Sequence, residues 1–211
     1  MSAAIILAGG PSSRFGRNKA LVELGHKPLI SYVVDACQAV VDSIIVAISG
    51  DDDTEAYVAA LPTNVELVKD AGRYRNPLNG MASGMEKLDA TYSVVLACDT
   101  PFIRSEVLKF LFEKVSGFNV AIPRWPNGYI EPLHAVYKIE AVREALPCIM
   151  KDRNARISSL INELDSVRYV RTDEIKRFDP HLTCFLNINS LQDLELARTS
   201  LTRQMTAQIT I

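Results

Sequence analysis

The sequence predicts a three-layer α/β protein in which a mostly parallel, twisted sheet carries helices on both faces. Apolar runs such as 43–49 and 92–98 show no polar alternation, which is typical of strands that are buried on both faces. Segments with apolar residues at helical spacing separate these runs, and such alternation builds parallel sheets. The 211 residues are 48% hydrophobic, enough for a single domain over 1–211 with a substantial core.

The first half of the chain supplies most of the expected sheet. Four strands are predicted, at residues 3–7, 43–49, 65–68 and 92–98. A helix should begin at Pro28, because proline is tolerated in a first helical turn. Its apolar face consists of Leu29, Tyr32, Val33, Ala36, Cys37 and Val40. Two more helices are expected, at 54–61 and within 76–88.

The second half departs from the simple alternation. A helix is predicted at 104–115 with Ser105 as its N-cap, followed by strands at 119–123 and 133–139. Between these strands the segment 123–132, "PRWPNGYIEP", is rich in turn residues, and we expect it to build a second wall of a cleft. The last helix should start after Ser190, with Asp193 in a capping-box position. The final eight residues receive no role.

Composition excludes several classes of function. A net charge of −2 argues against a nucleic-acid or membrane-surface protein. The chain contains no apolar run of 18 residues and its first residues lack a basic signal region, so we expect a cytoplasmic protein. The four cysteines are widely spaced and are expected to be buried thiols, none of them a nucleophile. The three histidines are isolated, which argues against a zinc site.

A basic, glycine-rich loop, "LAGGPSSRFGRNKAL" at 7–21, follows the first strand. Ligands of open α/β sheets bind at the carboxyl ends of strands, and N–H groups of glycine-rich turns converge on anions. Arg14, Arg17 and Lys19 add charge-assisted donors. The glycine spacing fits neither the P-loop nor the dinucleotide fingerprint. The loop therefore indicates a phosphate site of another kind, and the alternative is a solvated basic turn.

This loop resembles the L-A-G-G-x-S-x-R-M-G-x-x-K-x-L signature of the nucleotidyltransferases, with Phe15 where methionine is usual. Four further segments are similar to molybdenum cofactor guanylyltransferases: "NPLNGMASGM" (76–85), "ACDTPF" (97–102), "EPLHAVY" (131–137) and "FLNINSLQDL" (185–194). Asn76 stands where that family has glycine. The resemblance implies a Rossmann-like nucleotidyltransferase fold, with a nucleotide-binding half at about 1–103 and an acceptor-binding half at about 104–200.

The resemblance also implies a reaction and its participants. GMP would pass from GTP to the terminal phosphate of molybdopterin with Mg²⁺, releasing pyrophosphate, and the product would reach cofactor-insertion proteins or molybdoenzymes by transient contact. The implied catalytic residues are Arg14, Lys19 and Asp99. The implied nucleotide-binding residues are Leu7, Ala8, Gly9, Gly10, Ser12, Ser13, Lys19, Asp70 and Asp99. The implied acceptor-binding residues are Pro77, Leu78, Gly80, Ser83, Arg156, Asn187 and Asn189, and the implied metal ligands are Asp99 and Asn189.

The residues themselves support part of this assignment. Asp99 directly follows an apolar strand, where a carboxylate is a hard oxygen ligand of the kind that Mg²⁺ uses; the alternative is a turn aspartate. Asn187 and Asn189 would share one face of an extended segment, unless they form a turn before the helix. The cluster at 150–157, with Lys151, Arg153 and Arg156, is a solvated loop or a clamp on an anionic acceptor.

Other functions stay open at this point. The nearest alternative is a sister transferase that uses CTP or acts on another small phosphate. A non-catalytic nucleotide-binding regulator is more remote, because Lys19, Asp99 and Asn189 are all present. Selection of guanine requires acceptors, and we expect main-chain carbonyls near 7–10 and at the strand ends Ala47 and Val68 to supply them, since the family's usual asparagine is replaced by Ala47.

Overall fold

A computed structural model describes residues 1–10, 15, 18–70 and 76–209, with side chains up to residue 201. Its centre is a seven-stranded sheet with the strand order β5-β4-β1-β6-β8-β7-β9. The strands are β1 (Ser2–Leu7), β4 (Ser43–Ile48), β5 (Val65–Lys69), β6 (Tyr92–Ala97), β7 (Val120–Arg124), β8 (His134–Lys138) and β9 (Val167–Arg171). Among these strands β8 alone runs antiparallel to its neighbours, so the sheet is mostly parallel as predicted.

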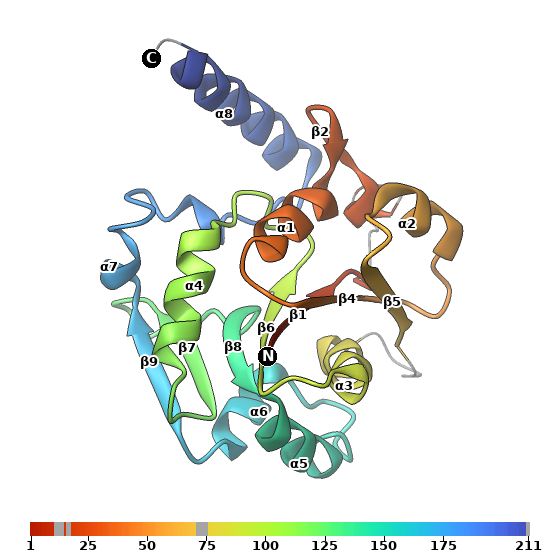
Figure 1. Ribbon diagram of the computed structural model, residues 1–211, viewed down its shortest axis with the longest axis vertical. Coiled ribbons are helices and arrows are strands. Elements are labelled where there is room, and N and C mark those ends of the chain that lie inside the picture. The colour runs from red at the N-terminus through yellow and green to blue at the C-terminus, as the bar shows by residue number, and fades with distance from the viewer. Residues whose placement is uncertain (11–14, 16–17, 71–75, 210–211) are drawn as a thin grey trace.

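Helices cover both faces of this sheet, which confirms the three-layer prediction (Figure 1). One face carries α1 (Leu29–Gln38), α2 (Thr54–Ala60) and α4 (Ser105–Lys114), and the other carries α3 (Pro77–Lys87), α5 (Ile139–Ile149) and α6 (Ile157–Glu163). Strand β1 shows why its sequence has no polar alternation: Ala4 and Ile6 enter one core, while Ala3 and Ile5 enter the other. Both sets of side chains are fully buried.

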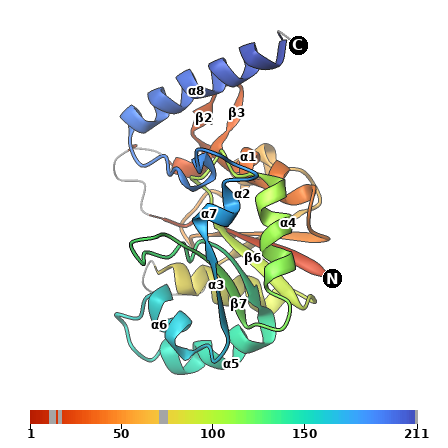
Figure 2. The same ribbon diagram turned by 90° about the vertical axis from the view of Figure 1, so that its left-hand side faces the viewer.

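The remaining elements complete the outer parts of the molecule. They are the hairpin β2 (Glu23–Leu24) and β3 (Lys27–Pro28), the helices α7 (Thr172–Ile175) and α8 (Leu191–Ile209), and 3₁₀ turns at Lys19–Leu21 and Thr183–Phe185. Helix α8 packs Leu194 and Ala197 against the hairpin region and then extends away from the body (Figure 2). Within the described part of the chain, no helix is both long and apolar enough to cross a membrane.

Among the α-helices and the strands of the central sheet, four elements have no counterpart in the sequence-based prediction: α5, α6, β9 and α7. Pro147 lies inside α5 and interrupts its helical signal, although the residue is exposed in the last turn. Strand β9, "VRYVR", lies at the edge of the sheet and alternates with charged residues, so it lacks the apolar signature of the inner strands. Propensity is weakest for such short peripheral elements, where packing decides the conformation.

Two predictions about local features were wrong. Ser105 does not cap α4: the N-cap is Arg104, with extended backbone and no side-chain cap bond, because Ser105 is already the first residue of the helix. Cys148 is exposed on α5, whereas Cys37, Cys98 and Cys184 are buried as predicted.

The predicted start of α8 is confirmed. The N–H of Asp193 donates to Ser190 Oγ (3.1 Å), and the Asp193 carboxylate accepts from the N–H of Asn189 (2.8 Å). The N–H of Asn189, which donates to the carboxylate, holds the pKa of Asp193 below its ordinary value. The reciprocal pair fixes the backbone at the end of the "NINS" segment.

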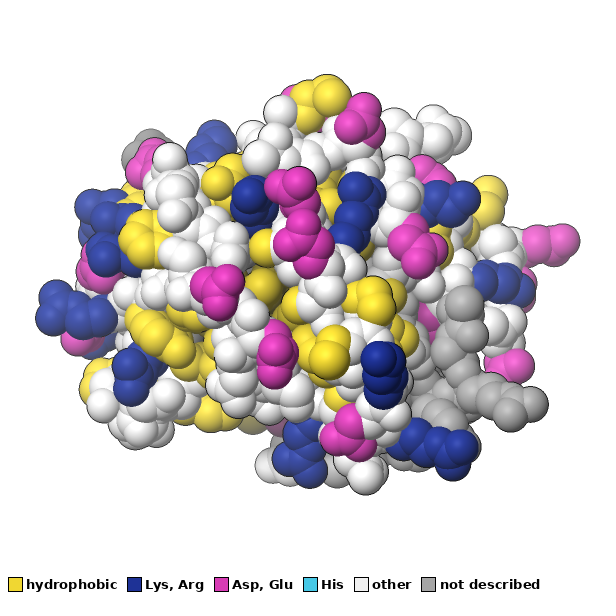
Figure 3. Space-filling view, turned by 90° about the horizontal axis from the view of Figure 1, so that it is seen from below, with side chains coloured by type: hydrophobic (Ala, Val, Ile, Leu, Met, Phe, Trp, Pro, Cys, Tyr) yellow, Lys and Arg dark blue, Asp and Glu magenta, His cyan; other side chains and the backbone are white. Residues whose placement is uncertain are grey.

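Charged side chains are mixed over the face that carries α3, α5 and α6. Lysine and arginine alternate with aspartate and glutamate across this surface, and no broad field of one sign covers it (Figure 3). The described residues of this face therefore do not form the basic stripe that a nucleic-acid-binding surface needs.

Arg143 of α5 completes the carboxyl end of α3. Its Nε donates to the carbonyl of Met85 (3.0 Å), and its Nη2 donates to the carbonyl of Leu88 (2.7 Å). We expect Arg143→Met to lower the free energy of unfolding by about 1 kcal/mol, because the helix end loses its donors. Thermal unfolding should show a Tm lower by about 2–4 °C, with unchanged nucleotide binding at 25 °C. Lys176→Met, which breaks an exposed ion pair with Asp173, is the control, and an equal loss in both variants would contradict the role of Arg143.

Candidate active site

A cavity of about 350 Å³ opens at the carboxyl ends of β1, β4 and β6. The chain places β4 and β5 on one side of β1 and then returns to place β6 on its other side, so the strand order reverses here. Ligands of open α/β sheets bind at such a reversal. The lining residues are Leu7, Ala8, Gly9, Gly10, Lys19, Ala47, Asp70, Asn76, Pro77, Gly80, Ala97, Cys98, Asp99, Leu133 and Asn189.

The first residues of the glycine loop continue the hydrogen bonding of the sheet. The N–H of Ala8 donates to the carbonyl of Ala47 (2.8 Å), and the N–H of Cys98 donates to the carbonyl of Leu7 (3.1 Å). The Ala8 donor is thus used by the sheet and would not be available to a phosphate. The carbonyls of Leu7 and Ala47, expected to face a base, already accept sheet hydrogen bonds, which weakens that expectation.

Gly9 lies too close to the neighbouring strand for any side chain. A Cβ at Gly9 would lie 2.9 Å from the main-chain nitrogen of Ser49. Backbone cannot give way as a flexible side chain can, so the close approach requires glycine. At the second glycine, Gly10, a Cβ would meet no atom of the described residues, so these residues leave room for a side chain there.

Three side chains from distant parts of the chain meet in the cavity. The ammonium of Lys19, at the start of a 3₁₀ turn, forms an ion pair with Asp99 Oδ2 and donates to Asn189 Oδ1 (2.7 Å). The N–H of Ile188 donates to the carbonyl of Asp99 (2.9 Å), which holds the "NINS" segment against the end of β6. The two side chains of the ion pair are 15% and 16% exposed, so water screens the pair only partly.

The second oxygen of Asp99 is buried without a partner. Oδ1 accepts no hydrogen bond from any described residue, although it lies beside the cavity. A buried carboxylate oxygen without a partner is costly, and native structures usually satisfy it with water, an ion or a ligand. This atom is therefore the strongest indication of where a cation would bind.

Cys98 lines the cavity next to Asp99. The sequence did not predict that any cysteine would line the site. Burial raises the pKa of the Cys98 thiol to about 12, and the neighbouring Asp99 carboxylate acts in the same direction. A thiol in this environment stays protonated at neutral pH and is a poor nucleophile. The expectation that no cysteine acts as a nucleophile is consistent with this protonation state.

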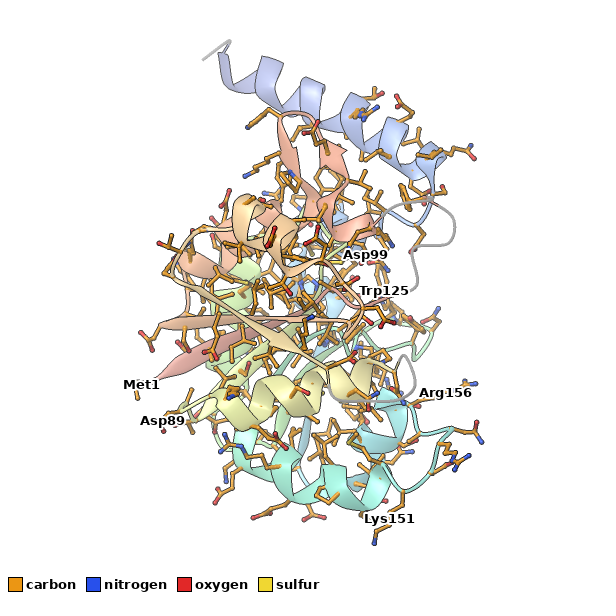
Figure 4. The ribbon with its side chains drawn as sticks, turned by 90° about the vertical axis from the view of Figure 1, so that its right-hand side faces the viewer. Met1, Asp89, Asp99, Trp125, Lys151 and Arg156 are labelled. Carbon is orange, nitrogen blue, oxygen red and sulfur yellow. The ribbon has the colours of Figure 1, made fainter. Side chains whose placement is uncertain are left out.

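The structure brings together most of the predicted site residues, but not all. Leu78 is fully buried in the core below the sheet, and Ser83 lies one helical turn further along α3 than the cavity. Asn187 and Arg156 are exposed and do not line the cavity; in Figure 4 Arg156 points outward, as does Lys151. Three predicted residues, Ser12, Ser13 and Arg14, lie outside the described residues.

The segment 123–132 does not form a wall of this cavity, contrary to prediction. Only the residue that follows it, Leu133, is part of the lining. Trp125 instead donates from Nε1 to Glu131 Oε1 (2.7 Å) and packs edge-on against Phe185. Burial raises the pKa of Glu131. The excursion therefore folds back on itself and braces the segment that leads to Asn189.

Asn76 is a site residue whose role the sequence did not reveal. Its Oδ1 accepts from the N–H of Leu78 (3.0 Å) and caps α3, while its Nδ2 donates to the carbonyl of Ala155 (2.9 Å). The side chain thus joins the helix that borders the cavity to the basic segment 150–157. The signal was its place directly before Pro77, because asparagine followed by proline at the first helical position is a strong helix start.

Comparisons with known proteins agree with this geometry. Residues 4–167 match the family model of the MobA-like NTP transferase domain. A Methanosarcina mazei protein named "probable molybdenum cofactor guanylyltransferase" is 33% identical over 197 residues, covering 91% of this chain and 88% of its own.

Solved structures give the same result. The molybdopterin-guanine dinucleotide biosynthesis protein A of Archaeoglobus fulgidus has a TM-score of 0.79 and 26% identity, covering 96% of this chain and all of its own. The 2-C-methyl-D-erythritol 4-phosphate cytidylyltransferase of Thermus thermophilus, at 18% identity and a TM-score of 0.69 over 96% of this chain and all of its own, shares the fold. The glycine loop, the cavity at the strand reversal and the family match lead to one conclusion: the chain is a nucleotidyltransferase and belongs to the MobA-like NTP transferases.

Proposed function

We propose that this enzyme transfers GMP from GTP to the terminal phosphate of molybdopterin and releases pyrophosphate. The names of the relatives support the substrates. The observation that carries the chemistry is the meeting of Lys19, Asp99 and Asn189 in a cavity beside the glycine loop. No protein nucleophile is needed, because the acceptor phosphate attacks the α-phosphorus directly, so catalysis depends on positioning and charge neutralisation.

The residues of the cavity fit a magnesium ion. The unpartnered Asp99 Oδ1 and the amide oxygen of Asn189 are hard donors, and Mg²⁺ in such enzymes takes one or two protein oxygens together with substrate phosphates. The described residues contain no cluster of three or more histidine, cysteine or acidic side chains that could hold a metal alone. The ion, when bound, would neutralise charge on the phosphate oxygens.

The ammonium of Lys19 contacts the two side chains that would hold the ion. The contacted atoms are Asp99 Oδ2 and Asn189 Oδ1. A cation at these groups would displace the ammonium toward the phosphates, where it would stabilise the charge that grows on the departing pyrophosphate. Gly9 and Gly10 would contribute main-chain donors on the other side of the phosphates.

The acceptor would bind between the start of α3 and the "NINS" segment. Pro77, Gly80 and Asn189 line the cavity and would contact the acceptor phosphate, as the family resemblance implies. Ser83, Asn187 and Arg156 lie outside the lining, so any contact with them would involve the more distant pterin part. Delivery of the product to cofactor-insertion proteins or molybdoenzymes, in the cytoplasm, belongs to the same proposal.

Asp70 is our choice for recognition of the base. Guanine presents N1–H and an exocyclic amine, and Asp70 lines the cavity together with Ala47 and Gly80. A carboxylate in the cavity wall would disfavour adenine. Adenine has an acceptor at N1, so the carboxylate oxygen that faces N1 would have no hydrogen-bond donor. We expect kcat/KM for GTP to exceed that for ATP by on the order of a hundredfold.

Steady-state pyrophosphate release with molybdopterin and each of the four NTPs tests the proposal. CTP is the critical competitor, because sister transferases with a similar loop use it. Equal or faster turnover of CTP would overturn the guanylyl assignment and leave the transferase assignment intact. If the enzyme did not turn over molybdopterin but did turn over a different phosphate acceptor, the assignment of molybdopterin as the acceptor would be wrong.

A further inference from the structure

Asn18 lies directly before Lys19, and its side chain is held by two other polar residues. Its Nδ2 donates to the hydroxyl of Tyr57 (3.0 Å) and to Asp52 Oδ1 (3.3 Å). Its Oδ1 accepts from the N–H of Ala20 (3.1 Å), which is the second residue of the turn that Lys19 begins. One side chain therefore fixes the backbone on both sides of Lys19.

The same cluster reaches the other end of the glycine loop. Tyr57 is fully buried on α2, and its hydroxyl can donate its proton to Asn18 Oδ1 (3.2 Å) or to the carbonyl of Ala8 (3.5 Å). The second oxygen of Asp52 accepts from the N–H of Ser49 (2.8 Å). That nitrogen of Ser49 is the atom against which Gly9 packs. Three elements, the end of β1, the β4–α2 connection and α2, thus meet at the residue before Lys19.

Buried polar groups need partners in any fold, so the existence of these bonds does not by itself indicate a functional role. Their positions are informative, because the outer bonds of the cluster end beside the glycine loop and beside Lys19. They involve Ala8, Ser49, which lies against Gly9, and Ala20, which follows Lys19. A lysine has a long flexible stem, and the position of its ammonium depends on how firmly its backbone is held. None of Asn18, Asp52 and Tyr57 lines the cavity, so none would touch the nucleotide directly.

We propose that Asn18, Asp52 and Tyr57 are positioning residues that hold Lys19 and the Ala8–Gly9 turn at a fixed separation, so that the phosphates of the nucleotide can meet both at once. This role rests on the proposed function, since it presumes a nucleoside triphosphate in the cavity. Burial raises the pKa of Tyr57, so its hydroxyl keeps its proton over the working range of pH and remains a donor. Preorganisation of this kind lowers the cost of binding and aligns the charge with the transition state.

A double-mutant cycle separates positioning from general stability. Tyr57→Phe removes the hydroxyl and keeps the buried ring. We expect it to weaken binding of the magnesium triphosphate roughly tenfold, measured by calorimetry, in an enzyme that has Lys19. In the Lys19→Ala background the same change should weaken binding less than about twofold, because the group that it positions is gone.

The matched control is Tyr32→Phe, which also removes a tyrosine hydroxyl that donates to a main-chain carbonyl, that of Leu24 (2.5 Å), away from the cavity lining. It should leave the Kd of the nucleotide unchanged. An equal weakening by Tyr57→Phe in both backgrounds, or a lower Tm with an unchanged Kd, would overturn the positioning role. The cycle uses the triphosphate that the wild-type enzyme binds most tightly, so a failure of guanine selectivity leaves this test intact.

Discussion

Asp99→Asn is expected to lower kcat for nucleotidyl transfer by about a thousandfold, while the protein still folds. The substitution keeps the size of the side chain and removes the charge that sits beside the ammonium of Lys19. It also neutralises Oδ1, the buried oxygen that lacks a partner. Charge at this place should matter most in the transition state, because that is where negative charge moves onto the leaving pyrophosphate. Pyrophosphate release at saturating GTP and acceptor, over a range of Mg²⁺ concentrations, gives the result.

Asp35→Asn is the matched control for this experiment. Asp35 pairs with Lys27 in another lysine–aspartate contact, and neither residue lines the cavity. This variant should retain wild-type turnover. If Asp99→Asn keeps more than roughly a tenth of the wild-type rate once Mg²⁺ is raised, Asp99 is not the principal metal ligand and the proposed arrangement of the site is wrong.

Lys19→Ala is expected to lower kcat/KM for the nucleotide by on the order of a hundredfold to a thousandfold, a loss of about 3–4 kcal/mol. Both constants should change, because the ammonium would contact the phosphates in the ground state and more strongly in the transition state. Lys27→Ala removes the lysine of the remote ion pair and should leave both constants unchanged. An unchanged kcat/KM in Lys19→Ala would exclude Lys19 from the site.

Removal of Lys19 should have the opposite effect on metal binding without nucleotide. The ammonium contacts Asp99 Oδ2 and Asn189 Oδ1, so its loss leaves the negative charge of Asp99 uncompensated and frees the Asn189 oxygen for a cation. We expect Mn²⁺, used as a paramagnetic probe, to bind Lys19→Ala more tightly than the wild-type enzyme by about tenfold, the result of removing one competing charge at a partly buried site. Weaker or equal binding would show that Lys19 and the metal use separate oxygens.

The layers of the fold and the edge of the sheet at which the cavity opens can be predicted from the amino-acid sequence. Continuous apolar runs such as those of β1 and β6 can be buried only between two helical layers, so the three-layer fold follows from the composition of the strands. The glycine loop follows the first strand and Asp99 follows the fourth predicted strand. Because the carboxyl ends of parallel strands meet at one edge of a sheet, the sequence predicts that they lie close together, and both line the cavity. Residues with a local signal were therefore predictable.

Contacts among these residues could be known only from the tertiary structure. Lys19, Asp99 and Asn189 are far apart in the chain, and their contact depends on the strand order and on the bond from Ile188 to Asp99. Arg156 carried an equally clear charge signal and yet lies outside the cavity. Tyr57 carried no signal of a site, because an aromatic residue in a short helix is normally a core residue, and only the fold brings its hydroxyl to Asn18 and Ala8. Contacts of this kind depend on long-range geometry, which local propensity and hydrophobic period do not encode.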